Sequence, residues 1–301
     1  MKHGELIRSR VLRGIALNRQ PGFHFPGNFL EVSFDRVSRG GTLLSFDSGP
    51  WCEAPDGQVD LAPLAILADL ALGACIRAQL SRETRVATVS LGLQFTGAPR
   101  RGRLQASAEF QGFFERGAGR LGLGRVSVAG SAGQICYGTG SFMALAPPKN
   151  VTLHPVPLRN RKSPQPRRLA ETDLAPAEGK ILLQADAALA SGGTFIRNFW
   201  TGAGKHILKN GLHAGNRVGH AQGGIMVALA AASAGAALPA NWLLSGISAW
   251  FISPGEGAAL RAASKVVHQG RLTAVVRTQV TGGNRRRVLD VVTTHGASED
   301  A

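Results

Sequence analysis

Two long apolar segments, each followed by long alternating segments, constrain the fold of this chain more than any other feature. The first is LAPLAILADLALGACI (residues 61–76) and the second is GGIMVALAAASAGAAL (residues 223–238). A helix that is apolar on all sides has to be covered on all sides. The residues after both segments alternate between apolar and polar and contain glycine turns, as half-buried antiparallel strands do. A curved sheet wrapped around a central helix satisfies both patterns.

The features that follow each helix recur in the same order. An aromatic residue is followed by proline four positions later and by glycine three positions after that, and the next strands resume with Gly-Arg-Leu. These residues are Phe95, Pro99, Gly102 and 119–121 in the first half, and Trp250, Pro254, Gly257 and 270–272 in the second. Such a repeat predicts an internal duplication. A hairpin turning at Gly40 and Gly41 is expected before the first helix. We therefore predict an α+β fold in which each half is a long helix followed by three or more antiparallel strands.

Composition sets broad limits on the class of protein. A chain of 301 residues that is 44% hydrophobic can hold one large or two average domains. Its three cysteines, Cys52, Cys75 and Cys136, support neither a disulfide framework nor a zinc site, so we expect no metal and a cytoplasmic location. The first twenty residues lack the apolar run of a secretion signal. Alanine, glycine and Pro239 in the stretch 223–242 favour a buried helix over a membrane span.

The net charge says less about the binding partner than the composition says about the class of protein. The 34 Lys and Arg residues against 19 Asp and Glu give a formal net charge of +15, which can attract nucleic acid or a phosphate-bearing ligand. Basic residues are spread thinly, with few aromatic residues to stack on bases, so we expect no nucleic-acid partner. The densest basic cluster, residues 149–168, is also rich in proline and predicts an extended surface linker. We place domains at residues 1–146 and 181–301 and the linker at 147–180.

The spacing of glycines and acid resembles that of the hotdog-fold acyl-CoA thioesterases, in particular the branch with phenylacetyl-CoA and 4-hydroxybenzoyl-CoA thioesterases. In that family Asn is followed after six residues by Gly-Gly, and an acid lies eight residues beyond the first Gly on the central helix. A hydroxyl residue on the next strand often assists. The resemblance covers residues 29–142 and 185–295. It implies two tandem hotdog folds, each a long helix wrapped by a curved sheet, that pack as an intrachain pseudo-dimer.

The second half supplies the start of this motif but not its acid. The motif residues that it retains are Asn216, Gly223 and Gly224. Ala231 occupies the acid position. Gln222 stands where the family usually has histidine, and His220 lies two residues earlier.

The first half is the complement of the second. Asp69 stands at the family's acid position and Thr88 at the position of the assisting hydroxyl. Leu61 and Ala54 stand where the Gly-Gly pair and the Asn would lie. Family members act as dimers in which the helix start of one subunit faces the acid of the other. The resemblance therefore implies one composite active site between the two halves and one inactive pseudo-site.

The helix start in the second half suits an oxyanion. Backbone N–H groups at a helix N-terminus are unpaired and lie at the positive end of the helix dipole. Gly223 and Gly224 have no side chain to block a thioester, so their N–H groups are the expected oxyanion donors. Asn216 is expected to hydrogen-bond the thioester or to fix the loop, and Gln222 or His220 to orient the same loop and contact substrate.

Asp69 is the expected catalytic acid-base group. A carboxylate among apolar neighbours needs a partner or a function. It would activate water as a general base or attack the carbonyl to form a mixed anhydride, and Thr88 would hold the water. The structural alternative is an ion pair with Arg77 or Arg85.

The sequence is also compatible with two other functions. A hotdog enoyl-CoA hydratase or dehydratase needs a catalytic histidine, and only His220 is near the motif. A non-catalytic acyl-CoA-binding protein is the other alternative, although retention of one full set of motif residues argues against random loss. We expect no cofactor besides the CoA of the substrate, and a homo-oligomer, namely a dimer of double-hotdog chains. Trp200, Trp250 and Phe251 are candidates for an acyl pocket, and residues 185–215 for a lid.

Overall fold

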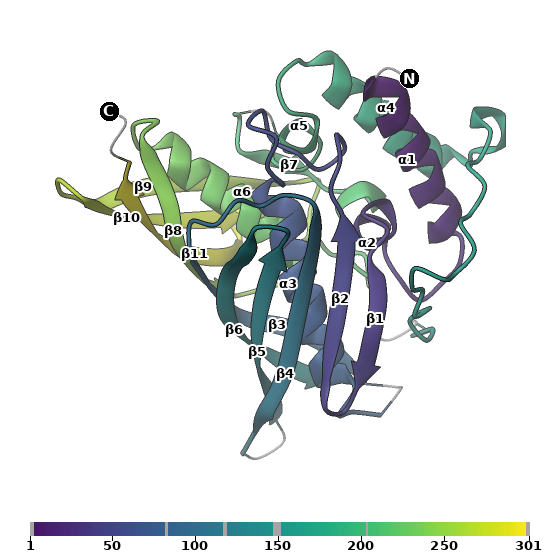
Figure 1. The fold of residues 1–301 in the computed structure, drawn as a ribbon, viewed down its shortest axis with the longest axis horizontal. Helices are drawn as coiled ribbons and strands as arrows, with labels where there is room; N and C mark the ends of the chain where they lie inside the picture. The colour runs from purple at the N-terminus through teal and green to yellow at the C-terminus, as the bar shows by residue number, and fades with distance from the viewer. Residues whose placement is uncertain (1–2, 82–83, 117–118, 147–151, 203, 299–301) are drawn as a thin grey trace.

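The computed structural model describes residues 3–81, 84–116, 119–146, 152–202 and 204–298. One antiparallel sheet of eleven strands forms its body, in the order β1-β2-β4-β5-β6-β3-β8-β11-β10-β9-β7. The sheet curves around two long helices, α3 (Leu61–Arg77) and α6 (Gly223–Ala236) (Figure 1). α3 packs on strands of the first half and α6 on strands of the second. None of the described helices is long and apolar enough to cross a membrane.

The two halves repeat one topology. In the first half the hairpin β1 (Ser33–Ser38) and β2 (Gly41–Asp47) precedes α3, and β3 (Arg85–Phe95), β4 (Arg103–Arg116), β5 (Gly119–Gly130) and β6 (Gly133–Leu145) follow it. In the second half the short strand β7 (Ile207–Lys209) precedes α6, and β8 (Trp242–Phe251), β9 (Ala259–Gln269), β10 (Thr273–Thr281) and β11 (Arg287–Ala297) follow it. Strand order in the second half mirrors that in the first. The predicted hairpin, both central helices and the duplication are confirmed.

The strands β3 and β8 join the halves into one sheet. They pair antiparallel from Ser90 opposite Trp250 to Gln94 opposite Gly246. Since each is the strand that follows its own central helix, this pairing brings α3 and α6 side by side. The two helices therefore occupy one shared interior rather than two separate cores.

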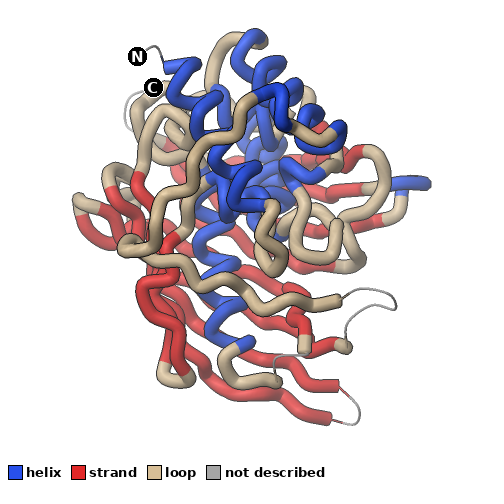
Figure 2. Tube along the Cα trace, turned by 90° about the vertical axis from the view of Figure 1, so that its right-hand side faces the viewer, coloured by secondary structure: helices blue, strands red, loops and turns tan. Residues whose placement is uncertain are grey.

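Further helices cover one end of this interior (Figures 1 and 2). They are α1 (His3–Asn18), α2 (Phe25–Phe29), α4 (Pro176–Ala190) and α5 (Phe195–Trp200). α1 packs on α2 and α4, and α4 packs on α5. Phe29 lies at the centre of their contact, with ring centroids 5.8 Å from Phe199 and 5.7 Å from Trp200. Burial of such large rings is a main source of stability in this layer.

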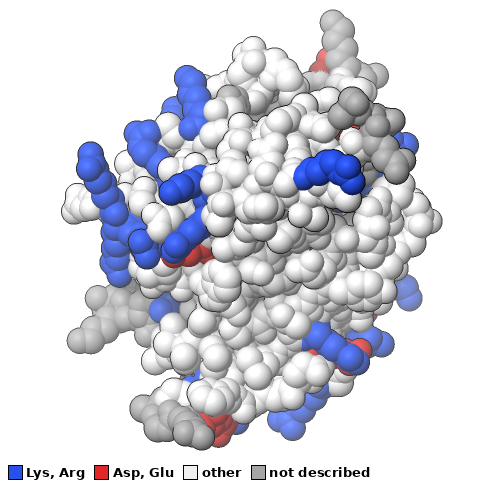
Figure 3. Space-filling model, turned by 90° about the vertical axis from the view of Figure 1, so that its left-hand side faces the viewer, with Lys and Arg blue, Asp and Glu red and all other residues white. Residues whose placement is uncertain are grey.

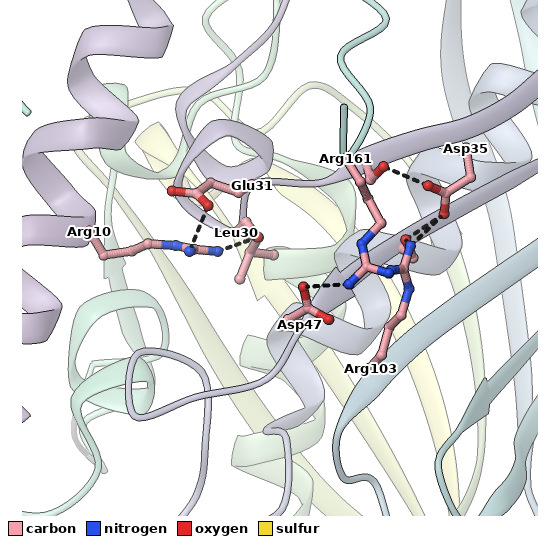
Figure 4. A network of polar contacts seen from close by, with 9 residues as sticks. Arg10, Leu30, Glu31, Asp35, Asp47, Arg103 and Arg161 are labelled. Carbon is pink, nitrogen blue, oxygen red and sulfur yellow. Dashed lines mark hydrogen bonds and ion pairs between the residues drawn. The ribbon is translucent and has the colours of Figure 1, made fainter. Parts of the chain in front are cut away.

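The predicted linker is extended but is fixed to the first half. Its start at residue 147 lies outside the described residues, and its predicted end at residue 180 falls within α4. The Phe34 N–H donates to the Arg159 carbonyl at 2.8 Å, and Arg161 lies 3.5 Å from Asp47 (Figure 4). Gly22, whose φ is +106°, lies so close to the linker that a Cβ added to it would be 2.0 Å from the Pro155 carbonyl oxygen.

α3 and α6 touch backbone to backbone. A Cβ added at Gly224 would lie 2.4 Å from the Ile66 nitrogen and 2.5 Å from the Ala65 carbonyl carbon. Neither helix backbone can yield as a flexible side chain would. Glycine at this position is therefore a requirement of the helix contact.

We expect Gly224→Ala to lower the free energy of unfolding by about 1–3 kcal/mol, because the added methyl group overpacks the contact. Gly235→Ala, in the same helix, is the matched control, since a Cβ there meets nothing within 4 Å. The control should be neutral or stabilising by up to about 1 kcal/mol, as alanine favours helix. Urea unfolding monitored by circular dichroism measures both. Equal stability of the two variants would contradict the proposed role of Gly224.

Candidate active site

The structure brings Asp69 of α3 beside the first residues of α6. The Thr88 hydroxyl of β3 donates to Asp69 Oδ1 at 2.9 Å, and Gln222 Nε2 donates to Asp69 Oδ2 at 2.8 Å. A Cβ added at Gly223 would lie 3.1 Å from Asp69 Oδ2. The carboxylate thus belongs to the first half, whereas the amide and the helix start beside it belong to the second.

Burial controls the acidity of Asp69. The residue is 9% exposed, and burial raises its pKa from 3.8 to about 6, although the hydrogen bond from Thr88 acts in the opposite direction. Within the described part of the chain, neither Arg77 nor Arg85 forms an ion pair with it. Asp69 is therefore held by two neutral donors, which leaves its charge uncompensated.

Gln222 connects the helix start to the carboxylate. Its Oε1 accepts from the Ile225 N–H at 3.0 Å, which makes it the N-cap of α6. Because Oε1 is used in this way, the amide turns its Nε2 toward Asp69. The side chain is 2% exposed. Gln222 therefore contacts the acid itself, beyond the loop-orienting role expected from the sequence.

The two glycines of the motif have different surroundings. Gly223 faces the Asp69 carboxylate and lines the adjoining cavity, whereas Gly224 faces the backbone of α3. Among the described residues, no hydrogen-bond acceptor lies on the N–H of Gly223. A free N–H at the first turn of a helix, next to a cavity, is suited to bind a developing negative charge.

The loop before α6 is fixed by its own side chains. Asn216 Oδ1 accepts from the backbone N–H groups of Val218 at 3.0 Å and His220 at 3.1 Å. His220 Nε2 lies 3.0 Å from Glu256 Oε1. The Ala221 N–H donates to the Gly255 carbonyl at 3.0 Å. The position of Asn216 thus agrees with the loop-fixing role considered for it from the sequence.

A cavity of about 360 Å³ adjoins these groups, a volume typical of small-molecule sites. Apolar side chains form much of its wall. The predicted site residues that line it are Asp69, Thr88, Asn216, His220, Gln222 and Gly223. No group of three or more His, Cys, Asp and Glu side chains in the described ranges is placed to hold a metal ion.

Two segments outside the motifs also line this cavity. Phe23 and His24 come from the stretch that leads into α2, and Leu153 and Val156 come from the linker. The sequence interpretation missed all four. The presence of Leu153 and Val156, two apolar residues in a basic stretch, was the one signal that could have indicated a buried contact.

The expected pocket aromatics and lid are only partly found. Phe251 lines the cavity. Trp200 is fully buried in the core, where its indole N–H donates to the His213 carbonyl at 2.9 Å, and Trp250 is 49% exposed. The expectation that residues 185–215 form a lid over the site is wrong, because their described part lines no wall of the cavity and packs with α1 and α2 instead.

Comparison with known proteins gives the fold but no close relative. No family model matches the sequence, and no curated protein matches it. A putative oleoyl thioesterase from Lactobacillus plantarum is similar in structure, with 11% identity, 88% of this chain and 100% of that chain covered, and a TM-score of 0.53.

Two further solved structures are similar over most of the chain. They are an acyl-ACP thioesterase from Bacteroides thetaiotaomicron (9% identity, 84% and 96% covered, TM-score 0.49) and a tesB protein from Mycobacterium avium subs paratuberculosis (12% identity, 88% and 95% covered, TM-score 0.48). The likeness to the Lactobacillus structure confirms the predicted fold, two tandem hotdog units in one chain.

We expect Asp69→Asn to stabilise the protein at pH 7. A folded-state pKa of about 6 against 3.8 in the unfolded chain means that the buried ionised form costs about 3 kcal/mol at pH 7. This cost is small at pH 4, grows between pH 4 and 6 because the unfolded chain ionises while folded Asp69 stays protonated, and is fully present at pH 7. The variant should therefore gain about 1–3 kcal/mol at pH 7 and almost nothing at pH 4.

Urea unfolding at the two pH values measures this difference. The exposed Asp173→Asn is the matched control and should equal the wild type at both. A variant at position 69 that is less stable than the wild type at pH 7 would show that the carboxylate is stabilising.

Proposed function

We propose that the protein is a thioesterase that hydrolyses acyl-CoA at one site built from both halves. The observation that supports this most is the buried Asp69 carboxylate, held by Thr88 and Gln222 and placed beside the free helix start at Gly223. This arrangement combines a base, a donor for an oxyanion and an adjoining cavity. Those are the parts that thioester hydrolysis needs.

The Gly223 N–H stabilises the oxyanion. When water attacks the thioester carbon, the carbonyl oxygen becomes negatively charged. An N–H at the positive end of α6 interacts more strongly with this charge than with the neutral carbonyl, so it lowers the barrier. In other enzymes one such donor contributes about 3–4 kcal/mol. Glycine is needed at this position because any side chain would lie against Asp69.

Asp69 moves the proton. With a pKa of about 6 it is ionised at neutral pH but is a stronger base than an exposed aspartate. It takes a proton from the attacking water, and it returns that proton to the sulfur when the carbon–sulfur bond breaks. Thr88 and Gln222 hold the two carboxylate oxygens in place throughout. The same geometry also serves direct attack of Asp69 on the carbonyl, with an anhydride hydrolysed in a second step.

A hydratase acting on enoyl-CoA is the second candidate. It is favoured by His220, which lines the cavity and lies 3.0 Å from Glu256, so that an acid is paired with the imidazole. In that case His220, rather than Asp69, would carry the proton.

A homo-oligomer is part of the proposal. On the strands β8 and β9, Leu243, Trp250 and Val267 are exposed by 49–62%, and Leu272, just before β10, is exposed by 65%. Figure 3 shows that charged residues are sparse over the centre of the face seen from the side of β8–β11. Exposed apolar side chains on a face with few charges favour association with a second chain.

We expect the wild type to release free thiol from acyl-CoA and Asp69→Asn to lose activity by about a hundredfold or more, because the base is removed. A screen with straight-chain and aromatic acyl-CoA esters measures this. His220→Ala is the matched comparison on saturated and enoyl substrates and should retain hydrolysis. Full hydrolysis by Asp69→Asn would exclude the proposed mechanism, and loss of enoyl hydration only in His220→Ala would favour the hydratase.

We expect kcat/KM of the wild type to fall as the pH drops below about 6, since protonated Asp69 cannot act as base. The hydrogen bond from Thr88 lowers the pKa of Asp69. Thr88→Val should therefore move the acid limb of the pH profile to higher pH, whereas Thr88→Ser should leave it in place. An unchanged profile in Thr88→Val would mean that another group controls the acid limb.

A further inference from the structure

Three arginines line the cavity away from the catalytic groups. Arg77 is the last residue of α3, Arg85 is the first residue of β3, and Arg217 lies in the loop before α6. All three are partly buried. They come from both halves of the chain, as the catalytic groups do.

Arg77 and Arg85 are displaced along their elements from the catalytic groups Asp69 and Thr88. Arg77 follows Asp69 by eight residues, a rise of about 12 Å along α3. Gly73 and Ala74 form the wall between them. Arg85 precedes Thr88 by three residues, about 10 Å along β3, and only seven residues connect it to Arg77. Arg77 and Arg85 therefore occupy the same end.

Arg217 faces that end from the second half. Its charge lowers the pKa of Arg77, after the larger effect of burial, to about 10. Burial, Arg217 and Arg77 lower the pKa of His24, another residue of the wall, to about 3. His24 accepts a hydrogen bond from the Gly27 N–H through Nδ1, as a neutral imidazole can. The cluster thus holds several like charges within reach of one another.

No acid in the described part of the chain neutralises this cluster. None of the three arginines forms an ion pair with a described residue, and Arg85 Nε is buried without a hydrogen-bond partner. Arg217 donates only to the His154 carbonyl among the described residues. Partly buried cations without a counter-charge are costly, so the cluster suits an anionic ligand.

Several arginines of the first half and the linker are paired with acids. Figure 4 shows Arg10 with Glu31, Arg103 with Asp35 and Arg161 with Asp47, at 2.8, 3.0 and 3.5 Å. The chain therefore does supply acids to arginines where they have a structural role. At Arg77, Arg85 and Arg217, by contrast, no described acid lies within ion-pair distance, although all three line the cavity.

We propose that this end of the cavity binds a carboxylate at the far end of the acyl chain, so that the preferred substrate is the CoA thioester of a dicarboxylic acid. The inference rests on the proposed thioesterase function. Guanidinium groups bind carboxylates through paired, charge-assisted hydrogen bonds. The wall between the two ends is apolar, with Leu70, Val86 and Phe142, and suits a hydrocarbon chain.

Matched pairs of substrates test the inference by hydrolysis. Adipoyl-, suberoyl- and sebacoyl-CoA are compared with hexanoyl-, octanoyl- and decanoyl-CoA. In the pair whose length fits the cavity, we expect kcat/KM to be about tenfold or more higher for the dicarboxylic member. Arg85→Gln and Arg217→Gln should each reduce this preference by about tenfold. Arg125→Gln, on an exposed arginine paired with Glu109 on the outside, is the matched control and should keep it.

A binding measurement without a thioester separates this inference from the proposed function. By calorimetry, octanoate should bind Asp69→Asn about tenfold more tightly than the neutral octanamide, and the difference should vanish in the double variants that add Arg85→Gln or Arg217→Gln. Arginine-dependent octanoate binding without any thioester hydrolysis would refute the proposed function and leave the anion site standing.

Two outcomes would overturn the inference. One is equal binding of octanoate and octanamide. The other is equal turnover of both members in every substrate pair, combined with an equal loss of turnover for both members in Arg85→Gln and Arg217→Gln. That result would mean that the arginines bind a phosphate of CoA.

Discussion

The contact between the first turn of α6 and the second turn of α3 determines the rest of this molecule. Gly224 lies directly on the α3 backbone at Ala65 and Ile66, so no side chain separates the two helices there. One residue earlier, the same approach places Gly223 against the carboxylate of Asp69. A wider helix spacing would move the acid away from the helix start. The packing requirement and the chemical arrangement are therefore met by two neighbouring glycines.

The cavity keeps opposite charges apart. Asp69 is held by the neutral donors Thr88 and Gln222, while Arg77, Arg85 and Arg217 line the same space without an acid among the described residues. An ion pair between the two groups would lower the pKa of the carboxylate and weaken it as a base. Without such an ion pair, the Asp69 carboxylate keeps its raised pKa, and the guanidinium groups stay available to bind an anion. With the proposed carboxylate of a ligand bound, the guanidinium groups gain a counter-charge that Asp69 does not supply.

The sequence predicted those elements and residues that local periodicity and motif spacing indicate. Periodicity located α3, α6 and the repeated strands, and the resemblance to the hotdog thioesterase motif singled out Asp69 and Gly223, which the fold brings together. Contacts between distant segments were not accessible in this way. The bond from Gln222 to Asp69 joins residues far apart in the chain, so only the docking of one half on the other reveals it.

Loops were the least predictable part for the same physical reason. Basic residues and prolines in the linker indicated an exposed tether, yet Leu153 and Val156 turn into the cavity. Length and glycines suggested a lid at residues 185–215, yet Trp200 is fully buried there. The composition of a segment indicates its average solvent exposure. It does not indicate which residues elsewhere in the chain its few apolar side chains will contact.

The pairing of β3 with β8 has a consequence for how the site is maintained. In a dimer of separate chains, a site made from two subunits disappears when the subunits dissociate at low concentration. Here the two halves belong to one chain, so the local concentration of one half around the other is set by the connecting segment and not by the amount of protein present. The joined sheet holds both partners in register at any dilution. Each copy is also free to change its residues without imposing the same change on the other, as Ala231, at the motif position equivalent to that of Asp69, illustrates.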